Sequence, residues 1–272
     1  MNDKLITVLT VNYNTADFIE LMLYALYKLT LNPYKVIICD NGSKDSEIIK
    51  LAKVVQKYDN IELILRKQSS FGSIGHAEAM DLLVSKVDTK YFVTMDSDAL
   101  FLSKGWDKDI ISSIDENVKV IGTALPSTKG SRKPVDFPLV FAVLYETATY
   151  HDINPSFMPG DLQEDNTKDT GWEIREKYLS HGIKSIVFHS HNTRFVTDTP
   201  FKELICAVYY FKGKLIASHF GRGSSGGVAK YHHKWWFKVP LISRFIRKYI
   251  GLKEKKEWIQ TCQNIVNKEV LN

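Results

Sequence analysis

Two aspartates separated by a single serine, Asp96 and Asp98, are the side chains in this sequence best suited to chemistry. In an extended or turning backbone, residues i and i+2 point the same way, so both carboxylates can bind one ion. Hard divalent cations such as Mg²⁺ and Mn²⁺ prefer oxygen ligands of this kind, including phosphate oxygens. A cation held there would neutralise negative charge on a departing phosphate group. A solvated acidic turn is the alternative, but the apolar run 91–95 directly before the pair favours a site.

The elements that must position this pair alternate between strand and helix. The sequence predicts strands at 5–11, 35–40, 61–65 and 91–95, with helices at 18–29, 46–58 and 76–87 between them. Apolar runs of this kind are typical of strands buried on both faces. The alternation predicts an α/β fold with a mostly parallel sheet and helices on both faces. Ligands of such sheets bind at the carboxyl ends of the strands, where Asn12, Asp40 and Asp96 fall.

The second half of the chain is less regular. It predicts strands at 118–124, 140–144, 186–189 and 215–219, an irregular loop at 155–167, and a helix at 171–181. From residue 231 onward the pattern is helical at best.

Composition places the chain among ordinary globular proteins. Of its 272 residues, 44% are hydrophobic and 25% are charged. The three cysteines are far apart, which argues against a disulfide framework and favours a cytoplasmic location. The sequence shows neither a signal-peptide pattern nor an apolar run of about 20 residues that would span a bilayer.

Basic residues are concentrated near the end of the chain. The net charge is +5, and residues 230–256 contain nine lysines and arginines against one acid, Glu254. This tail mixes the cations with bulky aromatics such as Trp235 and Trp236, a composition suited to the surface of an anionic membrane. The alternative is a helix that packs its aromatic residues onto the domain. No nucleic-acid-binding module is recognisable, so we expect no nucleic-acid partner.

Three short motifs together carry a family resemblance. Val-Asn-Tyr-Asn at 11–14, Asp-Asn-Gly-Ser-Lys-Asp at 40–45 and Asp-Ser-Asp at 96–98 resemble those of the GT-A glycosyltransferases of family 2. The resemblance implies a Rossmann-like GT-A domain with a nucleotide-sugar-binding half at 1–100 and an acceptor-binding half at 101–228. The basic aromatic tail at 229–272 would follow as a C-terminal helical segment.

The same resemblance implies an activity. Members invert the anomeric carbon as they move a sugar from a nucleotide-sugar to an acceptor, here a glycan or a lipid-linked sugar. The implied cofactor is Mn²⁺ or Mg²⁺. The implied location is the cytoplasm, with the inner face of the membrane as the place where the tail would act.

Several residues would bind the donor by this resemblance. Thr10, Val11 and Tyr13 would line the base pocket, and Asp40 would accept a hydrogen bond from the imide of uracil or thymine, which favours a UDP- or dTDP-sugar. Asp40 also suits capping of the turn after it, which is compatible with that role. Tyr13 equally suits a half-buried packing position.

The resemblance also assigns the metal ligands. Asp96 would lie near the ribose and the metal, and Asp98 would bind the metal directly. His219, at the end of a predicted strand, would complete the metal shell, and an imidazole favours Mn²⁺ over Mg²⁺. A satisfied structural histidine is the alternative for His219. His189 and His191 flank a serine without further metal-ligand spacing, so we interpret them as structural or acceptor-side.

A glycine-containing loop occupies the place where relatives bind the diphosphate. The amides around Gly72 could bind an anion at the start of a helix, although such a loop is often a plain turn. The Arg-Asn pair common in relatives is absent, so His76 or Arg66 would supply a donor.

An inverting reaction needs a carboxylate that takes the proton of the acceptor hydroxyl. In the family that the sequence resembles, this base is an acid at the start of a helix. Asp169 occupies the corresponding place here, although the usual Glu-Asp pair is replaced by Asp-Thr-Gly at 169–171. Glu164 and Asp165 are competing candidates for this base. Asp169 could instead be a helix N-cap, a position where aspartate is favoured in any protein.

The sequence also disfavours some other functions. Without a Gln-x-x-Arg-Trp signature or membrane spans, processive polymer synthesis is disfavoured. Nucleotidyl transfer would need a Gly-rich signature near the first strand, which the turn at 12–14 lacks. The non-enzymatic alternative is a carbohydrate- or membrane-binding module with an inactive sugar-nucleotide site.

Overall fold

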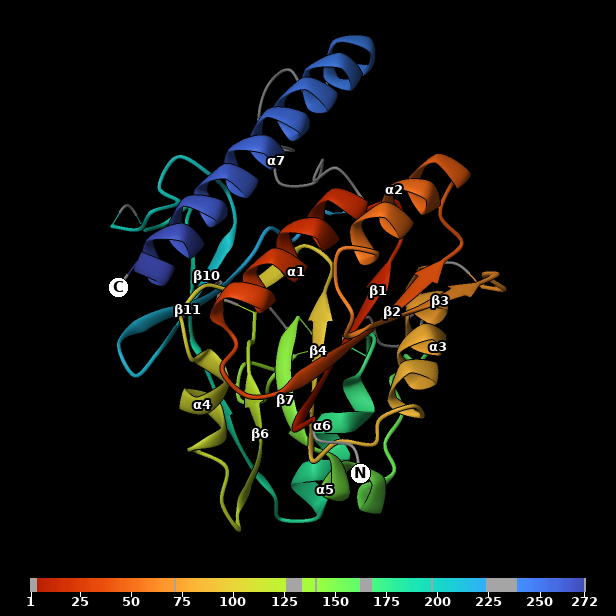
Figure 1. Ribbon diagram of the computed structural model, residues 1–272, viewed down its shortest axis with the longest axis vertical. Helices are drawn as coiled ribbons and strands as arrows, with labels where there is room; N and C mark the ends of the chain where they lie inside the picture. Colours follow the sequence, from red (N-terminus) through yellow and green to blue (C-terminus); the bar gives the residue numbers. More distant parts are fainter. Residues whose placement is uncertain are drawn as a thin grey trace.

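The computed structural model describes residues 4–70, 72–125, 134–139, 141–161, 168–196, 198–223 and 239–271. Its centre is a seven-stranded sheet in the order β3-β2-β1-β4-β7-β6-β8 (Figure 1). Strand β7 pairs antiparallel with β4 and β6, and the other neighbours are parallel. The strands are β1 (Ile6–Asn12), β2 (Tyr34–Asn41), β3 (Ile61–Arg66), β4 (Tyr91–Asp96), β6 (Val118–Gly122), β7 (Ala142–Glu146) and β8 (Lys184–Val187). The predicted α/β class with a mostly parallel sheet is confirmed.

Helices cover both faces of this sheet because its strands alternate apolar side chains between two cores. Ile6 and Val8 of β1 face one core, and Leu9 and Val11 face the other. The first core includes α1 (Ala16–Leu29), α2 (Asp45–Val55) and α7 (Pro240–Leu271). The second core includes α3 (Gly72–Val84), α5 (Thr147–Ile153) and α6 (Trp172–Ser180).

A second, four-stranded antiparallel sheet lies beside the first. Its order is β5-β11-β10-β9, from β5 (Ala99–Phe101), β11 (Lys214–His219), β10 (Ala207–Phe211) and β9 (His189–Asn192). Helix α4 (Trp106–Ile111) follows β5. Because β5 comes three residues after β4, its pairing with β11 brings the end of β11 to the carboxyl edge of the large sheet.

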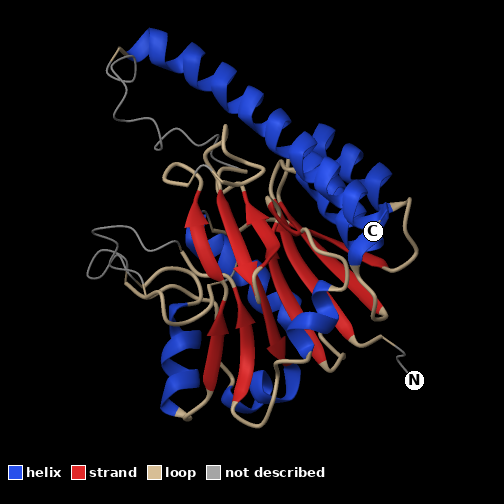
Figure 2. Cartoon of the chain, turned by 90° about the vertical axis from the view of Figure 1, so that its left-hand side faces the viewer, coloured by secondary structure: helices blue, strands red, loops and turns tan. Residues whose placement is uncertain are grey.

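The C-terminal helix α7 is the longest element, with 32 residues. It lies along α1, and Figures 1 and 2 show its N-terminal part extending beyond the body of the molecule. Within the residues that the structure describes, no helix combines the length and apolar character needed to cross a membrane. The aromatic and basic residues at 231–238 lie outside the described part of the chain.

The predicted elements differ from the structure mainly in length. The helix expected at 76–87 begins at Gly72 and ends at Val84, so the glycine-containing loop forms its first turn. The strand expected at 186–189 is divided between β8 and β9, which belong to different sheets. The pattern did not predict β5, α4 and α5, which have three to seven residues and therefore too few positions for a clear period. It also missed β10.

Candidate active site

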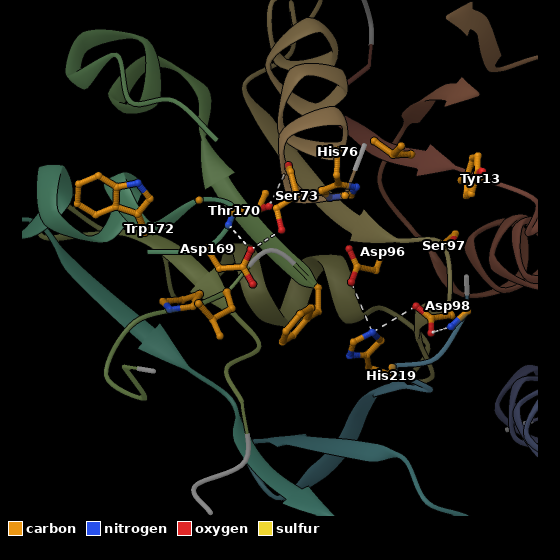
Figure 3. Close-up of a pocket in the computed structure, with 18 of the residues that line it drawn as sticks. Tyr13, Ser73, His76, Asp96, Ser97, Asp98, Asp169, Thr170, Trp172 and His219 are labelled. Atoms are coloured by element: carbon orange, nitrogen blue, oxygen red, sulfur yellow. Dashed lines mark hydrogen bonds and ion pairs between the residues drawn. The ribbon is translucent and has the colours of Figure 1, made fainter. Parts of the chain in front are cut away.

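Two carboxylates and one imidazole meet where β4 ends. The Nε2 atom of His219 lies 3.3 Å from Oδ1 of Asp98 and 3.5 Å from Oδ2 of Asp96 (Figure 3). One ligand atom from each of the three side chains lies within 4.8 Å of the other two. Asp96 ends β4, and Asp98 immediately precedes β5. The pairing of Ala99 with His219 then places the histidine beside both acids.

Both acids are buried, but their neighbours make their pKa values unequal. Burial and the neighbouring Asp98 raise the pKa of Asp96 to about 7, although His219 opposes the shift. Burial also raises the pKa of Asp98, but His219 and the N–H groups of Arg222 and Gly223 together outweigh it and hold that pKa at about 2. Two carboxylates this close cannot both ionise easily without a compensating positive charge. A bound cation would supply that charge.

The donor set fits a divalent cation. Two carboxylates supply hard oxygen ligands, and the imidazole adds a nitrogen that suits Mn²⁺ better than Mg²⁺. Phe141 stacks on the ring of His219 with 4.5 Å between the ring centroids, which fixes the orientation of the imidazole. The three residues can therefore hold a metal ion at one side of the pocket.

A tight turn supports Asp98 from behind. Oδ2 of Asp98 accepts hydrogen bonds from the backbone N–H of Arg222 at 2.8 Å and of Gly223 at 2.7 Å. A Cβ atom on Gly223 would lie 3.0 Å from Cβ and Cγ of Asp98, so a larger residue there would push the Asp98 side chain by a few tenths of an ångström. The other carboxylate oxygen, Oδ1, is thereby directed toward His219.

These residues form one side of a large pocket. Its volume is about 850 Å³, and it extends from Tyr13 past the two acids to Trp172 (Figure 3). Such a volume is typical of sites that enclose a small-molecule ligand. Residues 134, 137–139 and 141 line part of the wall with proline, leucine and phenylalanine side chains.

The end of β1 forms the side of the pocket where the resemblance places the nucleotide. Val11, Tyr13 and Asn41 line the pocket there, and Tyr13 is 41% exposed. Thr10 and Asp40 are buried behind this wall and do not line it. The hydroxyl of Thr10 has no hydrogen-bond partner among the described residues.

Asp40 is the centre of a buried hydrogen-bond network. It accepts one hydrogen bond from Nδ2 of Asn12 at 2.7 Å and another from the N–H of Ser43 at 3.0 Å. The bond to Ser43 is the turn cap that the sequence predicted for Asp40. The network ties the turn after β2 to the end of β1, and so shapes the pocket beside Tyr13.

The first turn of α3 borders the middle of the pocket. Gly72 has φ of +63° and lines the pocket with Ser73 and His76. Burial lowers the pKa of His76, although Asp169 opposes the shift, so the neutral imidazole is favoured. Arg66 does not line the pocket. Its guanidinium donates to Oδ1 of Asn41 at 2.7 Å and pairs with Glu78 at 2.5 Å.

Asp169 lies at the side of the pocket away from Asp98 (Figure 3). Its Oδ1 accepts two hydrogen bonds of 2.8 Å, from the hydroxyl of Ser73 and from the N–H of Thr170. Gly171 occupies the N-cap position of α6, so Asp169 is not the N-cap of this helix. Glu164 and Asp165, the competing candidates for the base, lie outside the described residues.

Sequence reasoning missed two contributors to the site and the supporting role of a third. Ser73 and Phe141 line the pocket and fix Asp169 and His219, respectively. The turn at Arg222 supports Asp98 with its backbone, while its side chain points to α7 and pairs with Glu254. No sequence signal identifies such partners, because each lies about 75 to 125 positions away from the residue it supports. His189 and His191 do not line the pocket, and their rings contact each other on β9 with centroids 4.4 Å apart.

Similarity to known proteins agrees with this architecture. A model described as glycosyl transferase family 2 matches residues 7–155. The chain is 26% identical over 159 residues to a processive diacylglycerol beta-glycosyltransferase of Mycoplasma genitalium, covering 58% of this chain and 41% of that protein. It is 28% identical over 94 residues to a teichoic acid poly(glycerol phosphate) polymerase of Staphylococcus epidermidis, covering 34% and 12%. The chain thus spans less than half the length of these curated relatives.

Solved structures share the fold. The mannosyltransferase PcManGT from Pyrobaculum calidifontis, in complex with GDP-Man and Mn²⁺, aligns with a TM-score of 0.50 at 15% identity, covering 67% of this chain and 54% of that chain. Residues 1–349 of S. aureus TarS align with a TM-score of 0.51 at 17% identity, covering 68% and 58%. At these identities the likeness concerns the fold alone.

Proposed function

The chain belongs to glycosyl transferase family 2, and on that premise we propose that it transfers a single sugar from a UDP- or dTDP-sugar to an acceptor, with inversion and with a divalent cation. The observation that carries the proposal is the meeting of Asp96, Asp98 and His219 inside the pocket. A buried pair of acids beside an imidazole is unfavourable without a cation and well suited to one.

Asp96, Asp98 and His219 would hold the cation, Mn²⁺ or Mg²⁺, at the side of the pocket next to the nucleotide. When bound, the cation supplies Lewis-acid stabilisation of the diphosphate that leaves. A structural neighbour, PcManGT, was solved with GDP-Man and Mn²⁺, which agrees with this assignment. The turn at 222–223 would keep Asp98 ionised and directed toward the cation.

The proposed reaction is a direct displacement. The acceptor hydroxyl oxygen forms a bond to the anomeric carbon, and the bond from that carbon to the diphosphate oxygen breaks. The electron pair leaves with the diphosphate, and the hydroxyl proton passes to the carboxylate of Asp169. Ser73 and the N–H of Thr170 both donate to Oδ1 of this carboxylate, which orients it at the side of the pocket away from the metal ligands. Glu164 and Asp165 remain the competing bases.

The base of the donor would bind between Val11, Tyr13 and Asn41. We also propose that Asp40, which with Thr10 lies buried directly behind this wall, is the acceptor for the imide N–H of uracil or thymine. Each oxygen of Asp40 accepts one hydrogen bond within the protein and keeps a second lone pair for the ligand. The amides around Gly72 would approach the donor from the start of α3.

We propose a glycan or a lipid-linked sugar as the acceptor. Two relatives are named for acting on diacylglycerol and on teichoic acid, which favours an acceptor at a membrane. The basic tail at 229–272 would bring the enzyme to the inner face of that membrane, since its cations attract anionic lipids. In this proposal, residues 1–100 form the donor-binding half of the domain and residues 101–228 form the acceptor-binding half.

A panel of nucleotides tests the proposal. The melting temperature of the protein should rise with UDP or dTDP only when Mn²⁺ is present, and nucleotide-sugars should then be slowly hydrolysed. If no nucleotide changes the melting temperature with any metal, the transferase proposal is wrong. If a nucleotide binds but no sugar is transferred or hydrolysed, the alternative of a binding module with an inactive site is favoured.

A further inference from the structure

The C-terminal helix α7 reaches the metal ligands through a buried ion pair. Arg222, in the turn after β11, pairs with Glu254 of α7, and the Arg222 side chain is only 1% exposed. Its guanidinium also donates to the backbone carbonyl of Ile205 at 2.7 Å and lies 4.1 Å above the ring of Phe220. An arginine stays charged in proteins, so a buried one needs its partners in place.

The backbone of the same residue supports Asp98. The N–H groups of Arg222 and Gly223 donate to Oδ2 of Asp98, and the N–H of Phe220 donates to its backbone carbonyl at 2.9 Å. Three donors from one turn thus surround one proposed metal ligand. Any shift of the turn would move the carboxylate, because both N–H groups hold Oδ2 and Gly223 packs closely against the side chain of Asp98.

Helix α7 is fixed against the turn by its own packing. Trp258, one turn beyond Glu254, is 1% exposed and donates from Nε1 to the hydroxyl of Ser218 at 3.0 Å. Its ring lies 5.6 Å from that of Phe220 and 5.7 Å from that of Phe18, measured between centroids. The helix therefore holds Glu254 rigidly beneath the turn.

We propose that Arg222 and Glu254 are positioning residues for the metal site, so that α7 takes part in metal binding as well as in folding. The proposal rests on the proposed function, because it concerns the ligand that Asp98 would provide. The ion pair fixes the backbone of the turn, and the turn fixes the carboxylate oxygen that faces His219. Partners that orient metal ligands in this way commonly change metal affinity when they are altered.

The chain supplies a matched control on the same helix. Lys255 pairs with Asp17 of α1 at 2.6 Å, but its side chain is 23% exposed and that of Asp17 is 52% exposed. The variants Glu254→Gln and Lys255→Gln each remove one charge from neighbouring positions of α7. Only the first breaks the buried pair with Arg222.

The test is a titration of the full-length protein with Mn²⁺ alone, with free Mn²⁺ measured by electron paramagnetic resonance. We expect Glu254→Gln to weaken Mn²⁺ binding by about tenfold or more and Lys255→Gln to leave it unchanged. Hydrogen–deuterium exchange of residues 219–223 should become faster in the first variant only. Wild-type affinity and wild-type exchange in Glu254→Gln would overturn the proposal.

A double variant separates positioning from simple stability. Arg222→Met with Glu254→Leu leaves no buried unpaired charge, so it should fold even if Glu254→Gln does not. We expect its melting temperature without metal to stay near that of the wild type while Mn²⁺ binding remains weak. Wild-type Mn²⁺ affinity in this double variant would overturn the proposal, because the pair would then serve folding alone.

The same experiment distinguishes this proposal from the proposed function. If the wild-type protein binds no Mn²⁺, the metal-dependent function fails. The exchange measurement then decides the role of Glu254 by itself. Faster exchange at 219–223 supports the positioning role, and unchanged exchange contradicts it.

Discussion

The two sides of the pocket hold their acids in different ways. At the metal side, Asp98 is 6% exposed and its carboxylate is supported by two backbone N–H groups and an imidazole. At the other side, Asp169 is half-buried, and a serine hydroxyl and one N–H both donate to its Oδ1. A ligand for a cation must stay ionised in a fixed place, whereas a base must exchange a proton with a substrate that arrives from solvent. The difference in burial therefore matches the difference in proposed role.

The largest effect should come from the metal side. Asp98→Ala removes a proposed metal ligand, and we expect transfer to fall by about a thousandfold or more, because a bound cation would contribute several kcal/mol to the departure of a phosphate. The stabilisation by Mn²⁺ with UDP should disappear as well. Product formation and melting temperature measure the two effects. A variant that keeps either one would contradict the assignment of Asp98.

The other side of the pocket should separate binding from chemistry. Asp169→Asn keeps the size of the side chain but cannot take a proton, so we expect transfer to fall by about a hundredfold or more. Binding of the donor and Mn²⁺ should not change, because Asp169 lies away from the metal ligands. Steady-state kinetics with nucleotide titrations measure both. Undiminished transfer would show that Asp169 is not the base and would leave Glu164 and Asp165 as the candidates. Glu164→Gln and Asp165→Asn are the variants that test these two residues in the same way.

The two acids at the proposed metal site should also differ in their response to pH. Without metal, Asp96 has its pKa raised to about 7 by burial, so it holds a proton below that pH and must lose it when a cation binds. Mn²⁺ affinity should therefore be constant above about pH 7 and fall by up to about tenfold per pH unit below it. Asp98, with its pKa held at about 2, is ionised throughout and adds no slope.

Calorimetry in buffers of different ionisation enthalpy checks this expectation, since Mn²⁺ binding near pH 6 should release the proton of Asp96 in addition to any proton that His219 holds. Asp96→Asn should lower the number of protons that are released for each Mn²⁺ bound. An affinity that does not vary between about pH 5.5 and 8 would contradict the unequal pair of acids.

The smallest effect concerns the support of Asp169. Ser73→Ala removes one of the two hydrogen bonds to Oδ1, and a hydrogen bond to a charged group that is partly exposed contributes about 1.5 kcal/mol, or about tenfold in kcat. KM for the donor should not change. Ser73→Thr retains the hydroxyl and should recover most of the activity. If Ser73→Ala lowers kcat no more than Ser73→Thr, this support is unimportant.

Only some residues of the site could be predicted from the sequence. Asn12, Asp40 and Asp96 could be placed together from the sequence, because neighbouring parallel strands end at the same edge of a sheet. His219 was found through its motif, and the structure adds the reason for its position, which is the pairing of β11 with the short strand β5. Local pattern alone does not predict a pairing between segments about 120 residues apart.

The supporting partners could not be predicted for the same reason. Glu254 lies in a basic segment that suits either a membrane contact or a helix packed on the domain, and its composition does not say which side chain pairs with Arg222, as the structure does. Ser73 belongs to a turn that could have served as a plain loop. Their contacts depend on the packing of α7 and α6 against the sheets, which involves residues from the whole chain.

The most direct test of the metal site is anomalous diffraction from a crystal grown with Mn²⁺ and UDP, recorded at the manganese absorption edge. We expect one strong peak within bonding distance of Asp98 and next to Asp96 and His219, with the UDP diphosphate on its open side. UDP bound in the pocket with no peak there, or with the manganese bound elsewhere, would contradict the proposed role of these three residues.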